Sequence, residues 1–147
     1  MRFRRPLILT LFLVAACATI APFSQRAYEQ ATSAKAQALL VIDGATEPFA
    51  NHKAEVRDLR LVVERAYEYA KGRPKNELAT QQWEIIRDPK RKSLGGFLTR
   101  WEEKGVLSPE FVSDQKSEIA KHFDEVIGLE VGKVVPKGEE TTYGEAR

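Results

Sequence analysis

Few side chains in this sequence could carry out catalysis or hold a metal ion. The 147 residues include one cysteine, Cys17, and two histidines, His52 and His122. One cysteine cannot form an internal disulfide, and this Cys/His set is too small for a structural zinc site. The sequence also lacks the G-x-S-x-G, P-loop, H-E-x-x-H and G-x-G-x-x-G motifs, which are signatures of nucleophilic, nucleotide-binding and metal sites.

The remaining polar residues are typical of solvated surfaces. His52 falls on an apolar helical face, where a core histidine with one polar partner is more common than a ligand. Glu102 and Glu103 stand beside Lys104, whereas the paired carboxylates of a glycosidase need a concave cleft. We therefore predict no catalytic residue, no cofactor, no metal site and no enzymatic activity.

The surroundings of Cys17 indicate export from the cytoplasm. Arg2, Arg4 and Arg5 form a basic start, residues 7–14 form an apolar run, and two alanines precede the cysteine. This order is that of a secretory signal. The apolar run is too short for a membrane-spanning helix, which needs about 20 residues.

The stretch Leu13-Val14-Ala15-Ala16-Cys17 resembles the lipobox of bacterial lipoproteins. The resemblance implies that residues 1–16 are removed, that Cys17 carries a thioether-linked diacylglycerol, and that its new amino group is acylated. Two or three acyl chains anchor a protein stably. Ala18 stands where an Asp favours retention in the inner membrane, so the resemblance implies the periplasmic face of the outer membrane. Residues 17–22 would form the lipidated tether.

The net charge of +2 comes from the export signal. Without its three arginines, 20 basic residues remain against 21 acidic ones, and the net charge becomes −1. That balance does not indicate nucleic-acid binding.

The mature chain has the periodicity of helices. Between residues 23 and 43, Ala27, Ala31, Ala34 and Ala38 follow one another at helical spacing. Small side chains let a second helix approach closely. This stripe could be a partner-binding surface, or it could pack against the chain's own second helix, and we favour internal packing.

A more regular apolar face follows, with steps of three and four residues. Its members are Phe49, His52, Val56, Leu59, Val63, Ala66 and Ala70. Pro48 could lie in the first turn of a new helix, or it could kink a continuous one. Because the apolar spacing keeps its phase across Pro48, we predict one long kinked helix over residues 23–71, roughly 70 Å in length.

The rest of the chain predicts shorter helices that return along the first. Asn76 is a candidate cap for a helix over 77–87, and Ser108 is one for a helix over 109–131. Between them, Asp88 is a candidate cap, with Pro89 in the first turn, for a helix that ends at about residue 104. No segment alternates with period two. The fold class is therefore all-α, a helical hairpin or small bundle over residues 23–131, with a disordered tail over 132–147.

Two features between these helices could serve binding. Arg87, Lys90, Arg91 and Lys92 form the densest basic run, which could meet anionic lipids, peptidoglycan or an acidic partner, or could be an ordinary exposed loop. The pair Gly95-Gly96 could be a hinge or docking surface, or could mark a kink or a close approach of two backbones.

These observations predict a lipid-anchored, helical periplasmic protein with a structural or adaptor role. Its partners would be the membrane, through Cys17, and an envelope protein or peptidoglycan. A homo-oligomer is also compatible with the apolar faces. The alternative is an inhibitor or immunity-type lipoprotein that binds an envelope enzyme or toxin.

Overall fold

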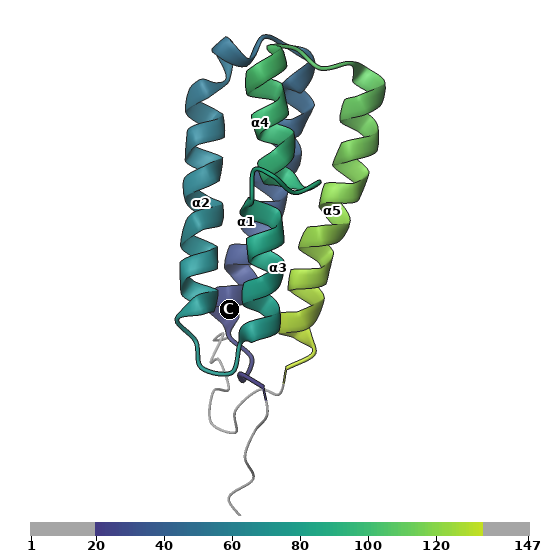
Figure 1. Ribbon diagram of the computed structural model, residues 1–147. Helices are drawn as coiled ribbons and strands as arrows, with labels where there is room; N and C mark the ends of the chain where they lie inside the picture. Colours follow the sequence, from purple (N-terminus) through teal and green to yellow (C-terminus); the bar gives the residue numbers. More distant parts are fainter. Residues whose placement is uncertain (1–19, 134–147) are drawn as a thin grey trace, which may run out of the picture.

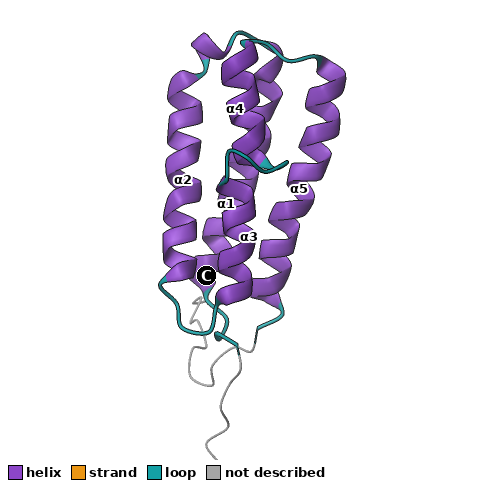
Figure 2. Cartoon of the chain, in the orientation of Figure 1, coloured by secondary structure: helices purple, strands orange, loops and turns teal. Residues whose placement is uncertain are grey.

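The computed structural model describes residues 20–133, and within this range the chain is all-helical (Figures 1 and 2). Cys17, the predicted signal segment and residues 134–147 of the predicted tail lie outside the described residues. The elements are α1 (Gln25–Asp43), η1 (Gly44–Thr46), η2 (Phe49–Asn51), α2 (Lys53–Lys71), α3 (Glu77–Arg87), α4 (Leu94–Lys104) and α5 (Pro109–Val131). The predicted all-α class is confirmed.

The helices form a small bundle rather than a single hairpin. α1 packs against both α2 and α5, and α3 packs against α2 and α5. α3 and α4 follow one another along a single column, so four columns run up and down in alternation (Figure 1). The two ends of the described chain therefore lie at the same end of the bundle.

The core lies between the four columns. Six of the seven positions of the α2 apolar face are buried, and His52 is the exception. Trp101, Phe123, Ile42 and Leu59 are among the largest fully buried side chains. Burying each such side chain stabilises the folded state by roughly 1.5–3 kcal/mol.

The prediction of one long kinked helix over residues 23–71 is wrong. α1 ends at Asp43, and α2 begins at Lys53 and runs back beside it. Two hydrogen bonds fix the corner between them to the α4–α5 connection: Phe49 N–H to the Gly105 carbonyl (2.7 Å) and Leu107 N–H to the Ala45 carbonyl (2.9 Å). The apolar phase persists through the corner because Ala45 and Phe49 are buried at the end of the core.

The alanine stripe lies inside the bundle. Ala31, Ala34 and Ala38 are fully buried and Ala27 is half-buried. α1 contacts two neighbouring helices, and side chains this small let it approach both of them closely. Of the two interpretations of these alanines, internal packing, which we favour above, is therefore correct and the partner surface is not.

The predicted start of the helix that ends at about residue 104 is also wrong. α4 begins at Leu94 rather than at Pro89. Asp88 does not cap a helix: its Oδ1 accepts the Lys90 backbone N–H (2.8 Å) and its carbonyl accepts the Arg91 N–H (3.1 Å). These bonds form a turn in the loop that joins α3 to α4.

Gly95 and Gly96 allow that loop to lie against the first turn of α4. A Cβ on Gly95 would stand 2.3 Å from the Arg87 carbonyl oxygen, and one on Gly96 would stand 2.0 Å from that of Arg91. No side chain fits at such distances. Of the alternatives for this pair, the structure shows the close approach of two backbones.

Candidate functional site

The four predicted basic residues lie at the end of α3 and on the α3–α4 loop, and they differ in their contacts. Arg87 is part of the bundle's own packing, since its Nη1 stands 3.1 Å from Glu64 Oε1 and its guanidinium lies 4.0 Å from the centre of the Tyr67 ring. Lys90, Arg91 and Lys92 are exposed on the loop. These three residues are the part of the predicted surface that a partner could reach.

A groove opens between this loop, α4 and α5. Its volume is about 480 Å³. The name "basic groove" is used below for this feature, whose lining is Pro89, Lys90, Arg91, Lys92, Gly96, Phe97, Thr99, Arg100, Glu103, Phe111 and Gln115. Two of these residues form an aromatic wall: the rings of Phe97 and Phe111 are nearly parallel, with 6.2 Å between their centres. Arg100 lies over the Phe111 ring at 4.7 Å.

The lining of the basic groove is strongly positive. It has four cationic side chains and one carboxylate, that of Glu103. Arg91 stands 3.8 Å from Asp88, whereas Lys90 and Lys92 have no ion-pair partner among residues 20–133. Arginine and lysine at a groove with an aromatic wall bind carboxylates and phosphates, with the ring supplying contact area.

A second groove, of about 500 Å³, lies on the other side of α4, facing α2. Its floor is apolar and includes Val63, Ile86, Leu94 and Leu98. Two ion pairs lie at this groove, Arg60–Glu102 (3.0 Å) and Arg87–Glu64 (3.1 Å). Because these charges are already paired, this groove has less capacity to bind an ionic partner than the basic groove has.

The two histidines hold structural positions. His52 Nδ1 lies 2.7 Å from Glu55 Oε2, its Nε2 lies 3.0 Å from Glu47 Oε2, and its ring is 5.2 Å from that of Trp101. The hydrogen bonds to Glu55 and Glu47 raise the pKa of His52 above 6.5. His122 Nδ1 pairs with the hydroxyl of buried Ser93 (2.9 Å).

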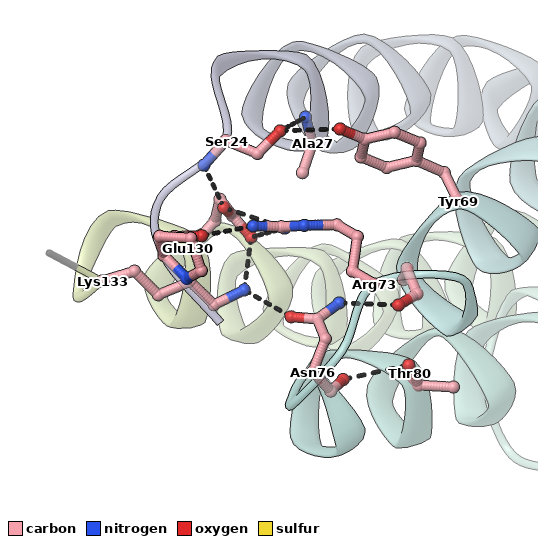
Figure 3. A network of polar contacts seen from close by, with 10 residues as sticks. Ser24, Ala27, Tyr69, Arg73, Asn76, Thr80, Glu130 and Lys133 are labelled. Carbon is pink, nitrogen blue, oxygen red and sulfur yellow. Dashed lines mark hydrogen bonds and ion pairs between the residues drawn. The ribbon is translucent and has the colours of Figure 1, made fainter. Parts of the chain in front are cut away.

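A buried polar cluster at the end of the bundle joins segments that are far apart in the chain (Figure 3). Glu130 Oε1 accepts the Ser24 backbone N–H (2.6 Å), and its carboxylate pairs with Arg73 (3.1 Å) and Lys133 (2.6 Å). Lys133 also donates to Asn76 Oδ1 (2.6 Å). These residues, Ser24, Arg73, Asn76, Glu130 and Lys133, are called the polar clasp below.

Sequence reasoning missed the polar clasp because its members have no common spacing. Glu130 looks like one charged residue among apolar neighbours, although its side chain is only 4% exposed. Contacts at this end of the bundle also change two predicted boundaries, those of the tail (132–147) and of the tether (17–22). Lys133 is held in the polar clasp and so does not belong to a disordered tail, and Ala21, placed in the tether, is buried and donates its N–H to the Lys75 carbonyl (2.8 Å).

Comparison with protein-family models, curated proteins and solved structures finds no match. Among the described residues, no group of three or more His, Cys, Asp or Glu side chains could hold a metal ion. None of the helices in that part of the chain is long and apolar enough to cross a membrane. The positive lining and the aromatic wall make the basic groove the candidate binding site.

Proposed function

We propose that this protein is a lipid-anchored adaptor on the periplasmic face of the outer membrane, and that it binds an acidic segment of an envelope partner in the basic groove. The lipobox-like sequence that ends at Cys17 supports the anchor. The charge and shape of the basic groove support the partner.

One observation carries the binding proposal. Lys90 and Lys92 are exposed beside an aromatic wall whose rings are held by packing against each other, and neither lysine has an ion-pair partner in residues 20–133. The mature chain carries a net charge of −1, so this positive charge is local rather than general. An acidic segment would pair with the cations, while an apolar side chain in that segment would pack on Phe111.

The place of the basic groove suits an anchored protein. α3 has 11 residues and therefore raises the α3–α4 loop about 16 Å above the end of the bundle where the described chain begins. Figure 1 shows this loop halfway up the bundle, reaching toward α5. A partner could therefore reach the basic groove while the protein is attached to lipid.

The direct test measures the affinity of the lipidated mature protein, in detergent micelles, for a Glu-rich peptide with one Phe. The triple variant K90E/R91E/K92E should abolish binding. The matched control K53E/R57E/R65E makes the same change of net charge on exposed α2 positions, and binding should survive. Equal loss in both variants, or tight binding of a Lys-rich peptide, would contradict the proposal.

A photo-crosslinker at Lys92 tests the same site in cells. Covalent capture of an envelope protein at Lys92, its absence at the control position Arg57, and its loss in a K90E/R91E background would support the adaptor role. A captured enzyme whose activity falls on binding would instead make the protein an inhibitor.

A further inference from the structure

Exposed apolar side chains gather at the end of the bundle where the described chain begins. Ile20, Leu78 and Val131 are 47%, 60% and 61% exposed, although they come from the start of the described chain, from α3 and from the end of α5. Between Ile20, Leu78 and Leu129 lies a groove of about 180 Å³ with a largely apolar lining. The name "apolar end" is used below for Ile20, Leu78, Leu129 and Val131.

The segment that leads toward Cys17 is held tightly to this end. Ala21 is 1% exposed and bonded to Lys75, and Ser24 is held by Glu130 in the polar clasp. Figure 3 shows Ser24 at the edge of the cluster formed by Arg73, Glu130 and Lys133. The tether is therefore fixed from Ala21 onward and contributes no length beyond that residue.

The distance between the lipid and the apolar end is consequently short. Cys17 and Ile20 are three positions apart in the sequence, with two residues between them, and a fully extended chain spans about 3.5 Å per residue. A lipid on Cys17 therefore keeps Ile20, the member of the apolar end nearest to it in the sequence, within about 10 Å of the lipidated residue.

We propose that the apolar end rests in the lipid head-group region of the membrane that holds Cys17, with the bundle standing away from it. This inference depends on the lipidation proposed above. Transfer of Ile20, Leu78 and Val131 from water into this region favours contact.

A second copy of the chain fits the apolar end less well. Four partly exposed side chains offer on the order of a few hundred Å², whereas stable protein interfaces bury roughly 600 Å² or more on each partner. The only other large exposed apolar side chains in residues 20–133 are Leu40, Leu61 and Val106, and they lie elsewhere on the bundle. A lipid surface, in contrast, is already present within reach.

The single cysteine makes a sharp test possible. Once Cys17 carries lipid, L78C introduces the only free thiol in the chain. A polarity-sensitive fluorophore on this thiol, in lipidated protein reconstituted into vesicles with quencher lipids, should shift to the blue and be quenched. L40C is the matched control, because Leu40 is 73% exposed in the last turn of α1, at the opposite end of the bundle. Its fluorophore should be quenched several-fold less.

The outcomes separate the inference from the function on which it depends. Equal quenching at both positions in a chain shown by mass to be lipidated would overturn only the membrane contact of the apolar end. Quenching at position 78 that appears only after deletion of residues 134–147 would overturn it too, because the tail would then be the occupant. A mature chain without lipid would overturn both proposals.

Discussion

Arg73 and Glu130 form an ion pair, with 3.1 Å between Nη1 and Oε2, that joins the α2–α3 connection to the last turn of α5. Their side chains are only 14% and 4% exposed. A second cation, on Lys133, lies 2.6 Å from the same carboxylate. This geometry makes Glu130 the centre of the bundle end at which the described chain begins.

Replacement of Glu130 by Gln should destabilise the protein by about 3–5 kcal/mol, because Arg73 and Lys133 would keep their charges in a buried place without a counterion. Chemical denaturation of the purified protein measures this change. The control is Glu102→Gln, which breaks a half-exposed ion pair with Arg60 and should cost about 1 kcal/mol or less. Similar losses in the two variants would show that the clasp is not buried as described.

Alanine at Gly95 or Gly96 should destabilise the protein by about 1–3 kcal/mol, because the new Cβ would collide with a backbone carbonyl. Gly128 provides the opposite case within α5, since a Cβ there meets nothing within 4 Å. Gly128→Ala should stabilise the helix by about 0.5–1 kcal/mol. Thermal denaturation of the three variants gives the comparison, and a neutral Gly95→Ala would contradict the close approach.

The free energy of unfolding should depend on pH through His52. Glu55 and Glu47 raise its pKa in the folded state, so the folded state binds the proton more tightly than the unfolded state does. This contribution is fully present below the unfolded pKa of about 6.5 and is lost as the pH rises through the raised folded pKa. Denaturation at a series of pH values should therefore show a decline that His52→Gln removes. A decline of the same size in the variant would assign it to another group.

Leucine at Ala38 should destabilise the bundle by about 1–3 kcal/mol, because Ala38 is fully buried in the helix that contacts both α2 and α5. Ala54→Leu, on the exposed face of α2, is the matched control and should have little effect. Urea denaturation distinguishes them. A tolerated Ala38→Leu would restore the interpretation of the stripe as an open partner surface.

Elements with local end signals could be predicted from the sequence closely. The bounds of α3 and α5 agree with the predicted ranges 77–87 and 109–131. Asn76 precedes α3 as predicted, but its side chain does not cap the helix and instead donates to the Ala70 carbonyl (2.9 Å). Ser108 acts as the predicted cap, accepting the Phe111 N–H (3.3 Å). Such signals depend only on neighbouring residues. The break between α1 and α2 could not be found in this way, since it is fixed by bonds from Phe49 to Gly105 and from Ala45 to Leu107.

The candidate site was predictable only in part, for the same reason. The density of charge identified Lys90, Arg91 and Lys92. The basic groove is completed by Arg100 from α4 and Phe111 from α5. No motif or spacing in the sequence relates these two residues to the α3–α4 loop. Their contribution comes from tertiary packing.

The anchor proposed at Cys17 can be tested by the intact mass of the membrane-extracted protein. We expect a mature chain that begins at Cys17 and carries a diacylglycerol and an N-linked acyl chain. Cys17→Ser should abolish this processing and release the protein from the membrane fraction. An unmodified Cys17, or unchanged processing and membrane retention in Cys17→Ser, would contradict the account.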